Sequence, residues 1–215
     1  MKTKKGSSRT LPQPSRTRDT QKSQRLEQVL AAAFEVFAAH GYEAARIDEV
    51  AERAGIAKGT IYLYFKGKDQ LFRAVVRNLI QKPVDEDAGN LSGRSEPMLR
   101  ELFARMYARV VLNPKARSII RLLIAESGKF PQLSDIYHRE IIAPGIAVVR
   151  QIVIKGVTSG EFRKTSAVDF PQFVVAPAVL AIVWRLLHGE RHALDLDAYM
   201  KAHLDFVLAS LRNEP

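Results

Sequence analysis

The spacing of apolar residues limits the fold of this chain more than any other feature of its sequence. Between residues 23 and 40, apolar residues recur at steps of three and four as Leu26, Val29, Leu30, Ala33, Phe34 and Phe37. Similar spacing returns at residues 47–54, 68–82, 96–113, 116–127, 132–158, 167–187 and 197–211. This period is typical of amphipathic helices. We therefore expect an all-α fold, with a loop over residues 83–97 and an interruption at Pro144-Gly145.

The segment Thr60–Phe65 is the exception, because its β-branched and aromatic residues alone would favour a strand. It follows the short helix expected at 47–54 and a turn that contains Gly55. Two short helices joined by such a turn are typical of a helix-turn-helix. As the second helix, the segment would bury Ile61 and Phe65, which lie four residues apart. Its outward residues would be Lys58, Gly59, Tyr62 and Leu63.

These outward residues suit contact with nucleic acid. Gly59 allows a close approach of the backbone, and a tyrosine hydroxyl can donate to a phosphate oxygen. Lys66 and Lys68 stand at the start of the next helix, where backbone amides and the helix dipole favour phosphate. We therefore predict a three-helix, helix-turn-helix domain over residues 23–67 that binds double-stranded DNA.

Residues 25 to 75 resemble the DNA-binding signature of the TetR family of bacterial transcriptional repressors. The matching positions are Ala33, Phe34, Phe37, Gly41, Tyr42, Ile47, Val50, Ala51, residues 54–56, residues 58–62, Tyr64, Phe65, Lys68, Leu71 and Phe72. The resemblance implies that Lys58, Gly59 and Leu63 face DNA bases. It also implies that phosphates are bound by Thr60, Tyr62, Tyr64 and Lys68. The Ser or Thr that usually caps each motif helix is replaced by Arg46 and Ala57, and Arg46 is a further candidate for a phosphate contact.

Residues 68–215 are predicted to form a helical ligand-binding and dimerisation domain. Residues 121–133 and 160–163 are similar to the AefR-like ligand domains, a resemblance that does not identify a ligand. The resemblance to the TetR family as a whole implies a small, mostly apolar effector. The candidate pocket residues are Met98, Phe103, Met106, Tyr107, Phe130, Tyr137 and Trp184. Each of these side chains also fits an ordinary place in the core, and that reading remains the main alternative.

The helix expected at residues 173–187 is apolar on nearly all faces and must be covered on all of them. Together with the helix at 197–211 it predicts a homodimer interface, unless it is a central core helix. The predicted interface residues are Val174, Ala178, Ala181, Arg185, Leu204 and Leu208.

The net charge of +10 is concentrated at the start of the chain, where residues 1–25 hold eight Lys and Arg against Asp19 alone. We interpret residues 1–22 as a disordered basic arm that either adds phosphate contacts or serves solubility. The chain has no cysteine, which excludes disulfides and thiol catalysis and fits a cytoplasmic, nucleoid-associated protein. The longest apolar run, residues 173–184, is too short to span a bilayer.

Other functional classes find little support. His188 and His192 have a spacing that could hold zinc, but Glu does not follow the first His directly and no third ligand is evident. A glycine-rich phosphate loop and a nucleophile elbow are absent from the sequence. The basic arm lacks an apolar anchor for a membrane. We expect no catalytic site, metal or cofactor, and predict a homodimeric repressor that an effector releases from a palindromic operator.

Overall fold

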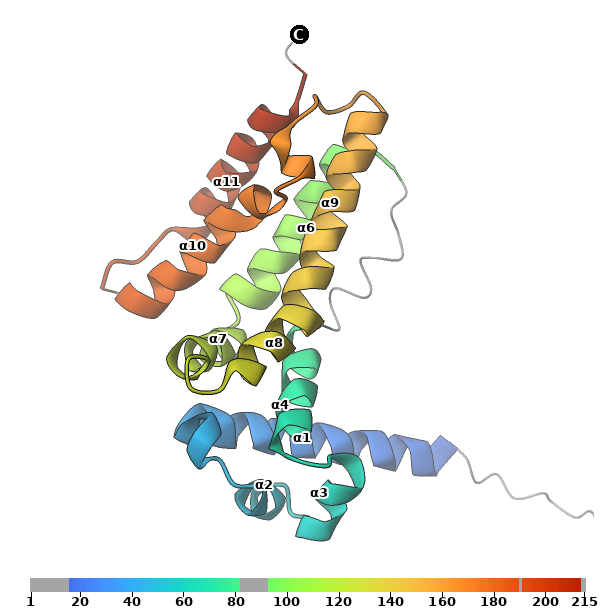
Figure 1. Cartoon of the computed structure of the whole chain (residues 1–215), viewed down its shortest axis with the longest axis vertical. Coiled ribbons are helices and arrows are strands. Elements are labelled where there is room, and N and C mark those ends of the chain that lie inside the picture. Colours follow the sequence, from blue (N-terminus) through green and yellow to red (C-terminus); the bar gives the residue numbers. More distant parts are fainter. Residues whose placement is uncertain (1–15, 82–92, 190, 214–215) are drawn as a thin grey trace, which may run out of the picture.

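The computed structural model describes residues 16–81, 93–189 and 191–213, and every named element within them is a helix (Figure 1). The predicted all-α fold is confirmed. Figure 1 shows a bundle of α1 to α4 at one end, here called the N-terminal part. The helices α6 to α11 form the C-terminal part, and α4 leads from one part to the other.

The N-terminal part consists of α1 (Arg16–Ala44), α2 (Ile47–Arg53), α3 (Lys58–Tyr64) and α4 (Lys68–Val76). The side chains at its centre are at most 1% exposed, and they include Val29, Phe37, Ile61 and Phe72. The rings of Phe37 and Phe72 meet edge to face, with their centroids 5.4 Å apart. Because Phe72 lies on α4, this helix shares the core of the helix-turn-helix bundle.

Helix α1 begins earlier than expected. It starts at Arg16, so the prediction of a disordered arm over residues 1–22 is wrong from Arg16 onward. The stretch 16–22 contains no Gly or Pro, and extending an existing helix forms one hydrogen bond for each residue that is fixed. The rest of the predicted arm, residues 1–15, lies outside the described residues.

The chain turns from α1 toward α2 at Gly41, where φ is 74° and ψ is 178°. This backbone conformation is open to glycine almost alone. The predicted end of the first helix at His40-Gly41 is therefore confirmed, although the hydrogen bonding of α1 resumes for one turn beyond it.

The C-terminal part opens with α6 (Ser95–Met106), which continues through a π-helical turn, η2 (Tyr107–Val111), to α7 (Pro114–Glu126). Another π-helical turn, η1 (Arg77–Gln81), extends α4. Residues 82–92, most of the predicted loop at 83–97, lie outside the described residues. The remaining elements are α8 (Pro131–Tyr137), η3 (His138–Ile142), α9 (Ala143–Thr158), a 3₁₀ turn η4 (Ser166–Val168), α10 (Gln172–His188) and α11 (Leu196–Leu211).

The expected interruption at Pro144-Gly145 takes the form of a change in helical hydrogen bonding. The π-helical turn η3 ends just before α9 begins, and the helix continues past Pro144. Proline cannot donate the i→i−4 bond, and its ring would clash with the carbonyl of Glu140, which lies inside η3. The wider π turn accommodates this defect, and such turns are a known cause of local irregularity in helices.

The combined run Pro131–Thr158 is long and apolar enough to cross a membrane by length and composition. Its residues Val148, Val149, Ile152 and Val153 are at most 5% exposed and pack in the core of the C-terminal part. A core helix passes the same test of length and composition.

The apolar core is continuous from the N-terminal part into the adjoining helices of the C-terminal part. Ile119 of α7 and Leu133 of α8 are at most 1% exposed and pack in one cluster with Phe37 and Phe72. A second cluster joins α6, α9, α10 and α11 farther from the N-terminal part. The helices α7 and α8 thus form a shared apolar layer between the two parts.

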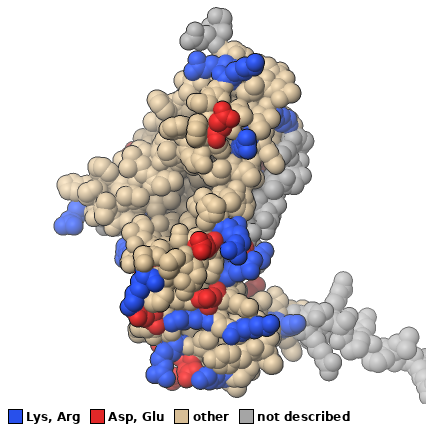
Figure 2. All heavy atoms as spheres, viewed as in Figure 1, with Lys and Arg blue, Asp and Glu red and all other residues tan. Residues whose placement is uncertain are grey.

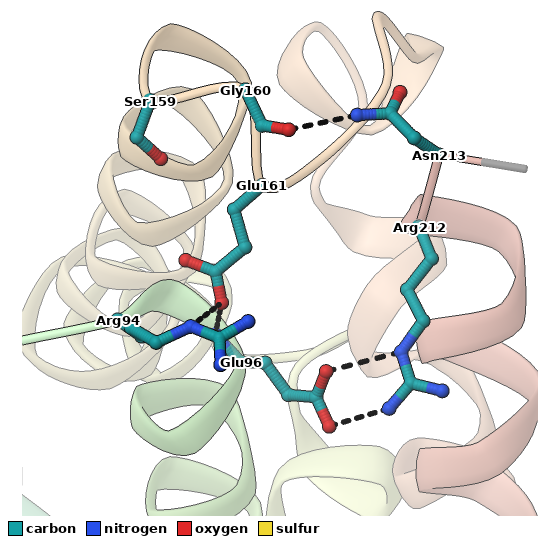
Figure 3. A pocket seen from close by; sticks show the side chains of 7 residues that line it. All are labelled: Arg94, Glu96, Ser159, Gly160, Glu161, Arg212 and Asn213. Atoms are coloured by element: carbon teal, nitrogen blue, oxygen red, sulfur yellow. Dashed lines mark hydrogen bonds and ion pairs between the residues drawn. The ribbon is translucent and has the colours of Figure 1, made fainter. Parts of the chain in front are cut away.

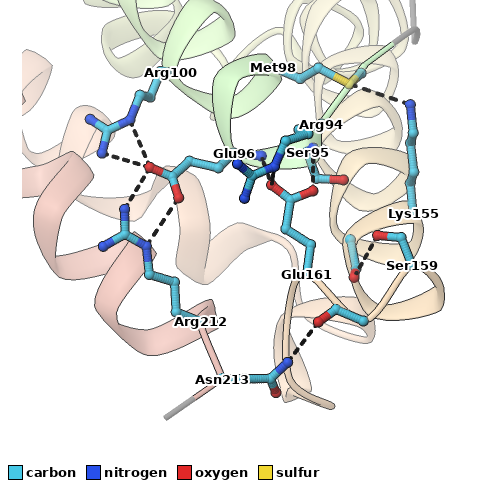
Figure 4. Close-up of polar contacts among 12 residues, drawn as sticks. Arg94, Ser95, Glu96, Met98, Arg100, Lys155, Ser159, Glu161, Arg212 and Asn213 are labelled. Carbon is cyan, nitrogen blue, oxygen red and sulfur yellow. Dashed lines mark hydrogen bonds and ion pairs between the residues drawn. The ribbon is translucent and has the colours of Figure 1, made fainter. Parts of the chain in front are cut away.

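The far end of the C-terminal part is fastened by polar contacts around a cleft of about 530 Å³ (Figure 3). The carboxylate of Glu161 accepts from the backbone amides of Ser95 and Glu96, at 2.8 and 2.9 Å. Hydrogen bonds from Arg212, and then from Arg100, lower the pKa of the Glu96 carboxyl (Figure 4). These pairs join the start of α6 to the end of α11 and to the predicted turn at residues 160–163.

Candidate DNA-binding surface and its contacts with the C-terminal part

Helix α3 places its side chains as predicted on two faces. Ile61 is fully buried, and Phe65, which follows the helix, is 8% exposed. On the opposite side Leu63 is 84% exposed and Tyr62 is 46% exposed. Lys58 and Gly59 are also exposed. The helix therefore presents a mixed basic, aromatic and aliphatic surface that is held from behind by the core.

The starts of α2 and α3 lack capping side chains, as the sequence predicts. Neither Arg46 nor Ala57 forms a side-chain cap hydrogen bond. The side chain of Arg46 is 78% exposed, so its guanidinium is accessible on the same end of the molecule. Figure 2 shows Lys and Arg gathered around the N-terminal part, with acidic residues among them.

Asp48, in the first turn of α2, is a residue of this surface that the sequence analysis missed. Its carboxylate lies 2.7 Å from the ammonium nitrogen of Lys58 and 3.8 Å from a guanidinium nitrogen of Arg46. The hydrogen bond from Lys58 to Asp48, with the attraction between their charges, raises the pKa of Lys58. Two predicted DNA-binding cations therefore share one carboxylate, which no regular spacing in the sequence reveals.

Lys68 is held within the protein to a greater degree than predicted. Its ammonium donates to the carbonyls of Glu43 and Ala45, at 2.8 and 3.3 Å, and lies 4.7 Å from the centre of the Tyr42 ring. Burial is the main cause that lowers the pKa of Lys68. Its predicted contact with phosphate stays a prediction, and its observed contacts fix the loop between α1 and α2.

Two further phosphate candidates, Thr60 and Tyr64, are half-buried. Tyr64 packs against the core of the N-terminal part, and its ring centroid lies 6.3 Å from that of Phe65. The roles of both residues in DNA binding stay predictions.

A carboxylate from the C-terminal part holds the last turn of α1, which follows the kink at Gly41. Glu126, the last residue of α7, accepts from the backbone amides of Tyr42 and Glu43, at 2.8 and 3.1 Å. A Cβ atom on Gly41 would lie 2.2 Å from the nearer carboxylate oxygen. Glycine at position 41 thus serves two purposes. It adopts the positive φ, and it leaves room for the Glu126 carboxylate.

Other contacts reinforce the same turn. The Tyr42 ring packs on Phe130 of the C-terminal part, with centroids 5.4 Å apart, and its hydroxyl donates to Asp69 at the start of α4. Lys129 pairs with the carboxylate of Glu43 at 2.5 Å. The turn at residues 41–43 thus contacts both α4 and the segment between α7 and α8.

A second carboxylate of the C-terminal part contacts α4 and its extension. Glu140, in η3, has a side chain that is 6% exposed and lies 2.5 Å from Arg73 and 3.4 Å from Arg77. A buried carboxylate is stable when it is paired in this way. Glu126 and Glu140 therefore attach the C-terminal part at two separate points, the end of α1 and the helical run of α4 and η1.

The seven residues predicted to line an effector pocket do not come together. Phe130 and Tyr137 pack near the N-terminal part, whereas Met98 and Phe103 belong to the second cluster of the C-terminal part. Trp184 is 37% exposed, and its indole N–H donates to the carbonyl of His192. The seven residues therefore do not share one apolar cluster, and their role in binding an effector stays a prediction. Phe103, Met106 and Tyr107 do lie along one continuous helical run, α6 and η2.

A buried polar pair that the sequence analysis missed lies beside this run. His203 of α11 is 4% exposed, and its Nδ1 lies 3.0 Å from the hydroxyl of Tyr107. Its Nε2 lies 2.9 Å from the carbonyl oxygen of Val174 in α10. Burial lowers the pKa of His203 and raises that of Tyr107 to about 12. The neutral imidazole thus accepts from Tyr107 and donates to Val174, joining η2, α10 and α11.

Five of the six residues predicted for a dimer interface are buried within the chain. Val174, Ala178, Ala181, Leu204 and Leu208 are at most 7% exposed, because they face the cores of the C-terminal part. Their assignment to an interface is wrong, and Arg185, which is half-buried, remains a prediction.

The exposed apolar residues of α10 lie on another face of that helix. Phe173, Leu180 and Leu187, seven positions apart, are 69%, 55% and 67% exposed, and we call them the α10 stripe. Phe206 of the adjoining α11 is 72% exposed. Figure 2 shows mostly uncharged atoms over α10 and α11 in this view. An apolar stripe of this kind is typical of a surface that a partner covers.

Comparison with known families bears on both parts of the chain. Residues 29–75 match the profile described as bacterial regulatory proteins, tetR family. Residues 92–207, more than half of the chain, match the profile described as the tetracyclin repressor-like C-terminal domain. The chain belongs to the TetR family. It is therefore a DNA-binding regulator of the helix-turn-helix type and not an enzyme.

Individual relatives agree with this placement. The HTH-type regulator YvdT of Bacillus subtilis is 40% identical over 73 residues, which span 34% of this chain and 38% of YvdT. The fatty acid metabolism regulator protein of B. subtilis is 24% identical over 198 residues, covering 90% of this chain and 99% of that protein.

Solved structures show the same fold. A TetR-family regulator from Mesorhizobium loti has a TM-score of 0.73 at 20% identity, covering 89% of this chain and 98% of that one. FadR from B. subtilis, solved with stearoyl-CoA, has a TM-score of 0.69 at 19% identity, covering 86% and 98% of the two chains.

Proposed function

We propose that this TetR-family regulator is a homodimeric repressor whose affinity for a palindromic operator falls when a mostly apolar effector binds the C-terminal part. The observation that carries the proposal is the attachment of the C-terminal part to the helix-turn-helix by Glu126 and Glu140. These contacts connect the C-terminal part to the end of α1 and to α4. Both helices share one apolar core with α3, the helix that carries the predicted base contacts.

DNA binding at one end fits the exposure of α3. Lys58, Gly59 and Leu63 are proposed to face base edges, and Tyr62 and Arg46 to contact phosphates. Thr60, Tyr64 and Lys68 complete the proposed phosphate contacts once DNA is bound. Lysine and an exposed leucine suit base edges, since lysine can donate to guanine O6 and N7 and an aliphatic group contacts the thymine methyl.

The α10 stripe supports a homodimer. Phe173, Leu180 and Leu187 give each chain an apolar surface that a second copy would cover in a two-fold symmetric contact. In a dimer, the two α3 helices would need a separation of roughly 34–36 Å to reach successive major grooves. Such a regulator would act in the cytoplasm, at the nucleoid.

The proposed effector is a small molecule with a large apolar portion. The second core of the C-terminal part is lined by apolar side chains such as Leu99, Phe103 and Val153. The Tyr107–His203 pair lies beside this core, with the His203 ring 4.7 Å from that of Phe103, and offers an effector's polar group a partner. The full-length likeness to the B. subtilis fatty acid metabolism regulator, and to the FadR fold solved with stearoyl-CoA, supports an acyl chain as the first class to test.

Release would follow from a difference in affinity. An effector that binds more tightly to a C-terminal part with a different spacing of its helices shifts the population away from the DNA-binding geometry. DNA and effector then weaken each other's binding by the same factor.

Selection of bound fragments from genomic DNA tests this function directly. We expect a fragment with inverted repeats, bound by a dimer, whose affinity falls when acyl-CoA thioesters of suitable chain length are added. Fluorescence anisotropy with the selected fragment and a shuffled duplex of equal length measures both affinities. Equal affinity for the two duplexes would overturn the operator proposal, and tighter binding of the fragment with effector would overturn the mode of release.

A further inference from the structure

We propose that Asp48 is a specificity-determining residue, which suppresses binding to non-operator DNA by pairing with Lys58 and Arg46 until a base edge of the operator competes for Lys58. The proposal rests on the DNA-binding function proposed above and adds an acidic residue to a surface otherwise described by its cations. No base or phosphate contact is assigned to Asp48 itself.

The geometry places Asp48 between the two cations. Its Oδ1 lies 2.7 Å from the Lys58 Nζ, and its Oδ2 lies 3.8 Å from a guanidinium nitrogen of Arg46. Lys58 begins α3 and Arg46 precedes α2, so the carboxylate joins the starts of the two motif helices. All three side chains are exposed, at 54% for Lys58, 78% for Arg46 and 46% for Asp48, so DNA can reach them.

The effect on non-operator DNA follows from the source of its affinity. Binding to arbitrary sequences comes almost entirely from cations that replace counterions on phosphates. A lysine already paired with a carboxylate contributes less, because the pair must be broken and the carboxylate repels nearby phosphates. Asp48 therefore lowers the affinity for every duplex that offers phosphates alone.

An operator offers Lys58 a second type of partner. Guanine presents O6 and N7 in the major groove, and two acceptors replace the single carboxylate when Lys58 reaches them. The loss of DNA affinity that Asp48 causes is then offset at the operator, whereas it remains at non-operator sequences. Specificity of this kind is obtained by weakening the wrong complexes, which is a common strategy at selective interfaces.

A structural role of Asp48 is separable from this effect. An acidic residue in the first turn of α2 also interacts favourably with the helix dipole. Asp48→Asn removes the charge with almost no change of shape, and thermal unfolding of the variant measures any loss of helix stability. The DNA measurements are made at a temperature where both proteins are fully folded.

The test compares Asp48→Asn with Glu101→Gln on two duplexes, the selected genomic fragment and a shuffled sequence. Glu101 pairs with Arg105 on α6, so its replacement changes the net charge equally but away from α3. We expect Asp48→Asn to bind the shuffled duplex about 3- to 10-fold more tightly, with a salt slope steeper by about one. Its ratio of specific to non-specific affinity should fall, and Glu101→Gln should behave as wild type.

A double variant identifies the partner. In Lys58→Met, the further change Asp48→Asn should have much less effect on the shuffled duplex, because the principal cation is gone. If Asp48→Asn raised the affinity for the shuffled duplex equally with Lys58 and with Met at position 58, the proposed pairing would be overturned. An unchanged affinity of Asp48→Asn for shuffled DNA, or a gain that Glu101→Gln matches, would overturn the inference as a whole.

Failure of the function and failure of the inference are distinguishable. If the wild-type protein does not prefer its selected fragment over shuffled DNA, the proposed function fails. If it does prefer that fragment, and Asp48→Asn retains the wild-type ratio of affinities, the inference alone fails.

Discussion

The carboxylate of Glu126 accepts hydrogen bonds from the backbone amides of Tyr42 and Glu43, at 2.8 and 3.1 Å. These two residues belong to the last turn of α1, beyond the kink at Gly41, whereas Glu126 ends α7. A helix of the C-terminal part therefore supplies the acceptor for backbone donors in the DNA-binding part. Any movement of the end of α7 must either carry this turn with it or leave two amides without their partner.

Glu126→Ala should destabilise the protein and loosen the link between its two parts. Loss of an acceptor for two backbone amides predicts a decrease of about 1–3 kcal/mol in the free energy of unfolding. The same variant should reduce the effect of an effector on DNA affinity, because the turn would no longer follow α7. Urea unfolding measures the first quantity, and operator titrations with and without effector measure the second. Full wild-type coupling in a folded variant would contradict the proposed route.

Gly41→Ala provides a matched test of the same contact. The positive φ of 74° and the clash of the new Cβ with Glu126 should together destabilise the fold by roughly 1–3 kcal/mol. In the double variant with Glu126→Ala the clash disappears. The double variant should therefore lose less free energy of unfolding than the sum of the losses of the two single variants. Strict additivity in urea unfolding would show that strain at Gly41 is independent of the carboxylate.

Stability should depend on pH through His203. Burial lowers its folded-state pKa below the usual value of 6.5, so the unfolded chain binds more protons between these two values. The free energy of unfolding should therefore decrease as the pH falls below about 7, until it passes the folded-state pKa. His203→Gln should remove this part of the slope in urea unfolding between about pH 8 and 5.

A control for His203 is provided by His138→Gln. His138 is exposed on η3, and its replacement should leave the wild-type slope nearly intact. If His203→Gln kept the full slope, the source of the pH dependence would be elsewhere.

The exposed Leu63 predicts a preference for thymine in the operator. An aliphatic side chain that is 84% exposed on α3 gains by covering the C5-methyl group in the major groove. Replacing a contacted thymine by uracil removes that methyl and should weaken wild-type binding about 4-fold. Leu63→Ala should bind the two operators with equal affinity. Replacing each thymine of the selected fragment by uracil in turn locates the thymine that Leu63 contacts. If no thymine is sensitive to this change, Leu63 does not contact a base.

The sequence predicted the helix-turn-helix because its pattern is local. Gly55 in the turn and the four-residue step from Ile61 to Phe65 determine which face of α3 is buried, and the structure agrees. The start of α1 at Arg16 escaped prediction because polar residues that extend an existing helix need no apolar stripe.

The remaining errors arise from contacts that are distant along the chain. Asp48 and Lys58, or Glu126 and Tyr42, meet only after folding, and neither pair has a characteristic spacing. On α10, nearly uniform hydrophobicity gives no information on which face is inward. Burial shows that Ala178 and Ala181 face the core, whereas Leu180 and Leu187 face solvent.

Leu187→Glu should therefore dissociate the proposed homodimer without unfolding the chain. Leu187 is 67% exposed in the α10 stripe, so glutamate is tolerated in the single chain but would be buried without a partner in a two-fold contact. The matched control is Ile124→Glu, because Ile124 on α7 is also 67% exposed but lies outside the stripe. Sedimentation velocity should give a monomer for Leu187→Glu and a dimer for both wild type and Ile124→Glu, with operator affinity lost in the monomer alone. A Leu187→Glu protein that sediments as a dimer would exclude the α10 stripe as the interface.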